Sequence, residues 1–231
     1  MQLIFEKNRF ITTFNEIKRY FRNYETEVSQ QRIKDFYKFA KILNDVGYEV
    51  AFDFVGSLNF GQAEEYSDVD FILYIGCDDH IDTDCDIYNC RNFTYVKYLI
   101  LETLIKEYVK KPYKTQVVDC INLIRLEKEL NKRTNVDLNL IFRFAFYRSI
   151  CRGVNLKILK PYHNQLLNRK DLIKTVEPFV DDVFYFFLQT NSQNLSFEKY
   201  RVRLNQFGIR LPPSILEKIK SYLYAFQNFS V

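Results

Sequence analysis

Two aspartates near the middle of the chain have the types and spacing to do chemistry. Asp68 and Asp70 are separated only by Val69 and open an apolar run. On a β-strand, residues two apart project to the same face, so these carboxylates are expected side by side. Two adjacent carboxylates repel each other unless a cation lies between them, and Mg²⁺ and Mn²⁺ prefer such oxygen ligands. The spacing predicts a Mg²⁺ site, with Mn²⁺ as the alternative ion.

A glycine–serine pair lies just upstream of these acids. Gly56 and Ser57 follow a stretch of alternating residues that predicts a strand. Glycine lets phosphate oxygens approach the main chain closely, and a helix that begins there favours negative charge. A phosphate-binding turn beside a cation site predicts a nucleoside triphosphate as ligand. Ser67 lies directly before Asp68, and we expect it to bind the nucleotide as well.

A third acid is expected to complete the chemistry. Transfer to a hydroxyl requires removal of its proton and stabilisation of charge, which two metal ions about 3.5–4 Å apart between carboxylates provide. Asp119 lies in an apolar run that predicts a strand, so it is the expected acceptor-side metal ligand, or the base for the acceptor. Asp137 is the competitor, but its position predicts the start of a helix.

The order Val55-Gly56-Ser57, ten further residues, then Asp68-Val69-Asp70-Phe71 resembles the signature of the DNA polymerase β-like nucleotidyltransferase superfamily. The resemblance covers about residues 50 to 122 and points to the bacterial drug-modifying or antitoxin-like members. It implies triphosphate binding by the glycine–serine pair, Mg²⁺ binding by the paired acids and a role for Asp119 as third carboxylate. Phe60 stands where such members frequently carry arginine, so one phosphate contact is missing.

The resemblance also implies a reaction. A nucleoside monophosphate, expected to be AMP from ATP, moves to an acceptor hydroxyl while pyrophosphate leaves. A small hydroxylated molecule, such as an aminoglycoside-type antibiotic, is the favoured acceptor; a partner protein's side chain and a nucleic-acid 3′ end stay open. The alternative function is a non-catalytic nucleotide-binding or protein-interaction module on the same fold.

Basic side chains are frequent between residues 141 and 175, which contain eight lysines and arginines but only one acidic residue, Asp171. Such a run is usually the solvated face of helices. Arg148 and Arg152 lie one helical turn apart, so they are the candidates for facing the cleft and binding the nucleotide.

Periodicity places these residues on an α/β fold. Strands are expected at about residues 48–55, 68–75 and 114–122. Helices are expected at about 10–24, from 29 to Gly47, at 93–111, at 137–153, from 175 and from 212. The prediction is a small mixed twisted sheet of the polymerase β-like nucleotidyltransferase type, with helices on one side and a helical C-terminal region. Residues 1–158 are expected to form the core with its N-terminal helices, and residues 159–231 the C-terminal region.

Composition excludes several classes of protein. The 231 residues are 47% hydrophobic with a net charge of +4, enough to bury a core, while no long uncharged apolar stretch predicts a membrane span. Charged residues among the first ten argue against a secretory signal. The cysteines are odd in number and lack CxxC spacing, which favours free structural thiols in a reducing cytoplasm over a metal or redox site. They are Cys77, Cys85, Cys90, Cys120 and Cys151.

The acidic stretch at residues 78–86 imitates the opening of a calcium loop. Ile87 stands where the loop glycine would be required, and Phe93 where the final glutamate would be. The stretch is therefore expected to be a solvated loop.

Overall fold

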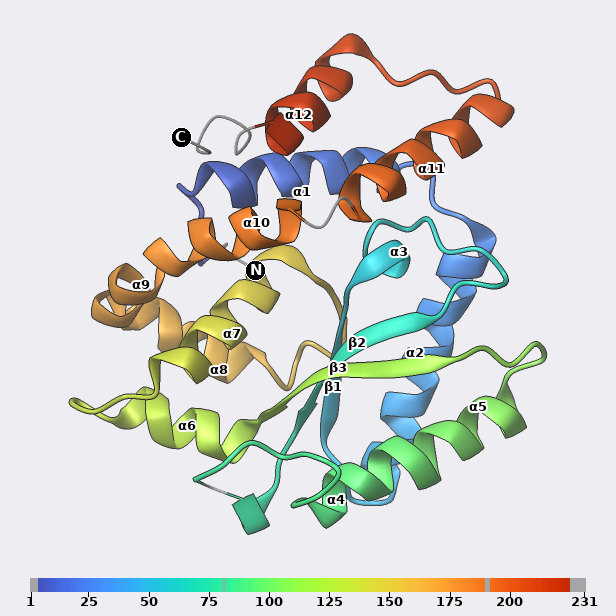
Figure 1. The fold of residues 1–231 in the computed structure, drawn as a ribbon. Helices are drawn as coiled ribbons and strands as arrows, with labels where there is room; N and C mark the ends of the chain where they lie inside the picture. The colour runs from blue at the N-terminus through green and yellow to red at the C-terminus, as the bar shows by residue number, and fades with distance from the viewer. Residues whose placement is uncertain (1–3, 81, 190–191, 225–231) are drawn as a thin grey trace.

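The computed structural model describes residues 4–80, 82–189 and 192–224, and within them four strands form one mixed sheet (Figure 1). The strand order is β3-β2-β1-β4, where β1 pairs antiparallel with both of its neighbours and β2 pairs parallel with β3. The strands are β1 (Val50–Phe54), β2 (Val69–Ile75), β3 (Thr115–Asn122) and β4 (Arg152–Val154). The predicted α/β class with a small mixed sheet is confirmed.

Helices make up most of the remaining described chain. In order they are α1 (Arg9–Arg22), α2 (Glu27–Asp45), α3 (Gly56–Asn59), the 3₁₀ turn η1 (Asp78–His80), α4 (Arg91–Thr94), the π-helical segment η2 (Tyr95–Leu101), α5 (Glu102–Tyr108), α6 (Leu123–Asn131), α7 (Leu138–Ile150), α8 (Lys160–Asn168), α9 (Lys170–Val176), α10 (Pro178–Gln189), α11 (Ser192–Gln206) and α12 (Pro213–Tyr224). Within the described ranges, none of these helices is long and apolar enough to cross a membrane.

Helices cover both faces of the sheet, so the expectation of helices on one side is wrong. Phe36 of α2 packs against Phe52, Phe54 and Phe71 on one face, with ring centroids 4.9–5.2 Å apart. On the other face, Tyr74 belongs to a cluster built mainly from α1, α7 and the C-terminal helices. All five residues of β1 are buried, and strands buried on both faces need cover on both.

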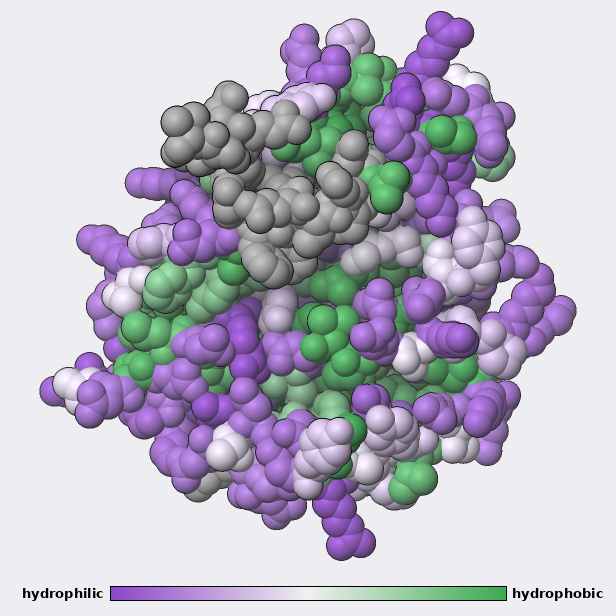
Figure 2. Space-filling model, in the orientation of Figure 1, coloured by the Kyte–Doolittle hydropathy of each residue, from purple (hydrophilic) through white to green (hydrophobic). Residues whose placement is uncertain are grey.

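The C-terminal helices and the N-terminal helix α1 both belong to the hydrophobic cluster that contains Tyr74. Phe184 of α10 lies 5.8 Å from Phe10 and 5.9 Å from Phe14, and Tyr222 of α12 lies 5.9 Å from Phe14, measured between ring centroids. The hydrophobic cluster therefore continues across residue 158. The expected division of the chain at that residue stays a prediction. On the face shown in Figure 2, hydrophilic side chains dominate the periphery and hydrophobic ones gather towards the middle.

The helix expected at 137–153 ends at Ile150, and its last residues instead form the edge strand β4. Gly153 pairs with Asp53 of β1, and Val154 pairs with Phe52. The prediction missed this strand because three residues are too few to show an alternating pattern. The helix expected at 93–111 is one run from Arg91 to Tyr108 that contains π-helical turns, and the helix expected from 175 begins at Pro178.

Gly153 provides a test of the β1–β4 contact. We expect Gly153→Ala to lower the free energy of unfolding by about 1–3 kcal/mol, measured by urea denaturation. A Cβ at this position would lie 3.0 Å from the Phe52 carbonyl oxygen and 2.5 Å from Asp53 Oδ1, and would also collide with Leu156. Gly76→Ala is the matched control, since nothing lies within 4 Å of the added carbon. Equal stability of the two variants would contradict close packing of β4 on β1.

Candidate functional site

The Gly56 turn lies directly against the Asp70 carboxylate. The Val55 N–H donates to the Asp70 carbonyl oxygen at 3.0 Å, so the chain leaves β1 beside the start of β2. Gly56 then adopts a left-handed φ of 58°, and a Cβ on it would lie 3.5 Å from Asp70 Oδ2. The left-handed backbone is what favours glycine here, since a Cβ would make only an ordinary van der Waals contact with the carboxylate. The structure thus brings two of the predicted site residues together.

The two acids of the motif lie near each other at the start of β2. Asp68 is exposed just before the strand, and Asp70 is half-buried within it, on the face that also carries Ile72 and Tyr74. Burial, and then the neighbouring Asp68 carboxylate, raise the pKa of Asp70. No basic side chain among the described residues offsets this effect on Asp70. Arg32 lies within electrostatic range of Asp68, so Asp70 is the acid that lacks a basic partner, and the two carboxylates together are a donor set that a hard divalent cation would neutralise.

The two serines of the motif differ in whether their hydroxyl groups form hydrogen bonds within the protein. The Ser67 hydroxyl accepts a hydrogen bond from the Glu64 N–H at 3.0 Å and so closes the turn that leads into Asp68. Ser57 is half-buried, and its carbonyl oxygen accepts from the Gln62 N–H at 2.9 Å. No hydrogen bond to the Ser57 hydroxyl occurs within the described ranges, so that hydroxyl is available to a ligand.

Sequence reasoning missed Arg32, which holds the segment before Asp68. From α2 its guanidinium donates to the carbonyl oxygens of Ser67 at 2.6 Å and Glu65 at 3.0 Å, and it stacks over Tyr113 at 4.5 Å. Burial lowers the pKa of Arg32, against the opposing effects of Tyr113, Asp68 and Asp35. An arginine on the apolar face of a predicted helix was the available signal.

Arg32 also borders a groove of about 710 Å³. The groove lies between the start of α2 and the connection from α5 to β3, and charged side chains of both signs line it together with two tyrosines. Because Arg32 holds the Ser67 carbonyl, this groove adjoins the segment that carries Asp68. The lining includes Arg32, Asp35, Glu65, Tyr108, Lys111 and Tyr113.

Asn59 is a second residue that sequence reasoning missed. Fully buried at the end of α3, it donates from its amide to the Ile150 carbonyl at 3.0 Å and accepts from the Arg152 N–H at 2.9 Å. Arg22 of α1 donates to the Asn59 carbonyl at 2.8 Å. This network fixes α3, and therefore the glycine–serine turn, to α1 and to the segment between α7 and β4. A polar residue between Leu58 and Phe60 was its only signal.

A β-bulge determines the direction of Asp119. Val117 pairs with Phe71 and Asp119 with Ile72, so Val118 is an extra residue. The bulge turns Asp119 to the face of Ile72, which is also the face of Asp70. There its Oδ2 accepts from the Tyr147 hydroxyl at 2.8 Å and lies 2.9 Å from Arg143 Nε.

Asp119 is thus on the expected face, but its carboxylate is engaged by α7. Asp68, and not Asp119, is the carboxylate that raises the pKa of Asp70. The role of Asp119 as third metal ligand stays a prediction. Its competitor Asp137 caps α7 by accepting from the backbone N–H groups of Asn139 and Leu140, which confirms its expected place at a helix start.

Arg148 and Arg152, the predicted nucleotide-binding arginines, both have carboxylate partners in the protein. Buried Arg148 forms an ion pair with Asp53, which also accepts from the Tyr74 hydroxyl at 2.7 Å. Arg152 forms an ion pair with Glu25. The guanidinium groups therefore link α7 and β4 to the structure around them, and nucleotide contact by either arginine stays a prediction.

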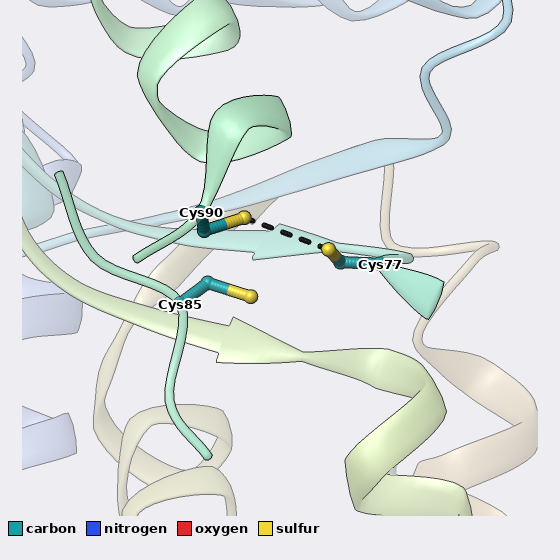
Figure 3. Close-up of side chains that lie close together, drawn as sticks. All are labelled: Cys77, Cys85 and Cys90. Carbon is teal, nitrogen blue, oxygen red and sulfur yellow. Dashed lines mark hydrogen bonds between the residues drawn. The ribbon is translucent and has the colours of Figure 1, made fainter. Parts of the chain in front are cut away.

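Three cysteines meet at the other end of β2, although their spacing predicts no metal site. The sulfur atoms of Cys77, Cys85 and Cys90 all lie within 4.8 Å of one another (Figure 3). Seven residues separate Cys77 from Cys85, which is longer than the usual zinc spacing, whereas the four residues between Cys85 and Cys90 are at its upper limit. The path of the chain between β2 and α4 brings Cys77 to this pair.

Comparisons of the chain with protein-family models, curated proteins and solved structures found no match. The chemistry of the site is therefore argued from its own geometry. The relevant arrangement is a left-handed glycine turn, an adjacent pair of carboxylates and a groove beside them.

The raised pKa of Asp70 predicts that its charge destabilises the metal-free fold. A group whose pKa is higher in the folded than in the unfolded chain stabilises the protein fully below the unfolded pKa, and this stabilisation is lost as pH rises through the folded pKa. We therefore expect Asp70→Asn to melt at a higher temperature than wild type in chelator at neutral pH. The difference should shrink as pH falls towards about 4, the usual pKa of aspartate.

Asp45→Asn is the control for this measurement because Asp45 is exposed near the end of α2. It should leave the melting temperature unchanged over the same pH range. A lower melting temperature for Asp70→Asn at neutral pH would contradict the inferred repulsion between Asp68 and Asp70.

The buried Arg148–Asp53 pair predicts a large effect on stability. We expect Arg148→Met to cost about 3 kcal/mol of unfolding free energy, because it leaves Asp53 charged and buried without its partner. Arg152→Met is the matched control and should cost about 1 kcal/mol or less, since its ion pair is partly exposed. Similar urea midpoints for the two variants would argue against a structural role specific to Arg148.

Proposed function

We propose that this protein is a Mg²⁺-dependent nucleotidyltransferase that moves a nucleoside monophosphate, AMP from ATP, to an acceptor hydroxyl with release of pyrophosphate. The observation that carries the proposal is the contact between the phosphate-binding type of turn at Gly56 and the Asp70 carboxylate. Asp68 lies close enough to raise the pKa of Asp70. The sheet would then be of the polymerase β-like nucleotidyltransferase type.

In this proposal the residues divide into two groups. Asp68 and Asp70 would hold the metal, and Asp119 would serve the acceptor side once released from Tyr147 and Arg143. Gly56 and Ser57 would bind the triphosphate, with Ser67 keeping Asp68 in place. A bound Mg²⁺, or Mn²⁺, would supply neutralisation of phosphate charge at the reacting centre.

The groove beside Arg32 supports a small hydroxylated molecule as acceptor. Its volume of about 710 Å³ lies within the range of small-molecule sites, and its lining combines acidic and basic side chains with Tyr108 and Tyr113. A protein side chain and a nucleic-acid 3′ end are the other acceptor classes to be tested. Five free thiols suit the cytoplasm as the compartment in which the enzyme would act.

A second candidate is a nucleotide-binding or protein-interaction module without turnover. The position of Asp119 favours it, because a carboxylate held by Tyr147 and Arg143 is not free to act on an acceptor. This candidate predicts that ATP binds with Mg²⁺ but that no pyrophosphate is released.

A transfer assay with nucleoside triphosphates labelled at the α-phosphate tests the proposal. Wild type, Asp70→Asn and the exposed control Asp45→Asn would each be incubated with Mg²⁺ and an aminoglycoside, a protein extract or RNA. We expect label transfer by wild type and by the control, and a loss of at least about a hundredfold in Asp70→Asn, because several kcal/mol of metal stabilisation disappear.

Two results would count against the proposal. Equal labelling by Asp70→Asn and wild type would remove Asp70 from the mechanism. ATP binding by wild type without pyrophosphate release with any acceptor would favour the non-catalytic module.

A further inference from the structure

Cys77, Cys85 and Cys90 converge from three points of the connection between β2 and α4. Cys77 lies two residues beyond β2, Cys85 lies in the loop that follows, and Cys90 caps the start of α4. Figure 3 shows the three sulfur atoms directed towards one space between these segments. The cluster lies at the opposite end of β2 from Asp68, so it is separate from the nucleotide site proposed above.

The distances suit a tetrahedral thiolate site. Cys77 Sγ lies 3.5 Å from Cys90 Sγ, and all three sulfur atoms lie within 4.8 Å of one another. Sulfur atoms bound to Zn²⁺ at about 2.3 Å in a tetrahedron are about 3.8 Å apart. Small side-chain movements would therefore place the three sulfurs around one ion.

Cys120 of β3 supplies a fourth thiol. It is buried in the same hydrophobic cluster as the other three and influences the Cys85 thiol, although its sulfur lies outside the group within 4.8 Å. Four thiols from β2, β3 and the intervening loop thus lie in one buried region. Four sulfur ligands are the donor set of a closed structural zinc site.

The surroundings provide hydrogen bonds to the sulfurs. The Phe93 N–H donates to Cys90 Sγ at 3.2 Å, and the Asn92 amide donates to Cys77 Sγ at 3.6 Å. The Asn122 side chain also accepts from the Cys77 N–H at 3.2 Å and donates to its carbonyl at 2.8 Å. Such outer partners orient metal ligands and stabilise the negative charge of thiolates.

The loop that carries Cys85 is held in place by charged contacts. Asp84 forms ion pairs with Arg125 and with Arg143, and Asp82 forms one with Lys128. The predicted solvated loop is therefore fixed at its centre to α6 and α7. This fixation would preorganise Cys85 for a ligand.

Burial argues against a redox role for the same cysteines. Cys77, Cys85 and Cys90 are at most 3% exposed, whereas redox-active thiols are accessible and have lowered pKa values. A metal ion can displace protons from buried thiols, but thiol exchange requires an accessible thiolate.

We propose that Cys77, Cys85 and Cys90 hold a structural Zn²⁺ ion, with Cys120 as the candidate fourth ligand that would fasten the loop between β2 and α4 to β3. The full-length protein would be purified under reducing conditions, and its zinc measured by mass spectrometry. Co²⁺ would replace zinc as a spectroscopic probe, since thiolate ligands give it an intense charge-transfer band. We expect one metal ion per chain and the cobalt–thiolate band in wild type.

Single substitutions identify the ligands. Cys85→Ser and Cys90→Ser should weaken Co²⁺ binding by more than the about 10–100-fold that loss of an outer partner costs. Cys120→Ser should do the same if it is the fourth ligand, and wild-type affinity in this variant would overturn its assignment. Cys151→Ser is the matched control because Cys151 lies in the other hydrophobic cluster.

Wild type alone can overturn the proposal, so the test does not depend on folding of a variant. Absence of zinc together with absence of the cobalt–thiolate band would show that the thiols are ordinary core residues. A Cys77–Cys90 disulfide found by mass spectrometry in unreduced protein, with no bound metal, would also exclude the site. Unaltered binding after Cys85→Ser or Cys90→Ser would place the metal elsewhere.

Discussion

The antiparallel pairing of β1 with β2 is the interaction on which the candidate site depends. Phe54 pairs with Phe71, so the end of one strand and the beginning of the next meet at a single edge of the sheet. The chain must turn soon after Phe54, and Gly56 makes that turn with a left-handed backbone beside Asp70. Phe36 packs against Phe52, Phe54 and Phe71 on the face of the sheet opposite Tyr74, and this packing holds the two strands together. Backbone pairing and aromatic packing thus determine the position of the acids before any ligand is present.

Local patterns sufficed to predict the parts of the fold whose determinants are local. Strands β1, β2 and β3 were expected within about two residues of their observed bounds, because alternating apolar residues carry that information. The glycine–aspartate contact followed from the same patterns, since adjacent strand ends leave few alternatives. Cover on the second face of the sheet was not predicted, because Asp53 interrupts the apolar residues of β1 in the sequence although the structure buries all five residues.

Long-range partners account for what the sequence did not reveal. Arg148 is ninety-five residues from Asp53, and the sequence near either residue does not indicate their ion pair. Asn59 and Arg32 act through backbone carbonyls, which have no signature in the sequence. The direction of Asp119 depends on the extra residue Val118, and periodicity cannot locate a bulge without the partner strand. The cysteine cluster is a shorter-range case, because its members lie within one connection but converge only through the path of the loop between β2 and α4.

Strand β2 carries chemistry at both of its ends, with the acids before and within its first residues and a thiol just beyond its last. A shift of a single residue in its pairing would turn Asp70 to the opposite core and displace Cys77 from its companions in one event. Insertions and deletions in this strand are therefore far more damaging than substitutions of comparable size. Loops at either end can change length without such coupling. Natural variation in the length of this protein should accordingly be confined to its connections, while the segment from Val69 to Ile75 keeps its seven residues.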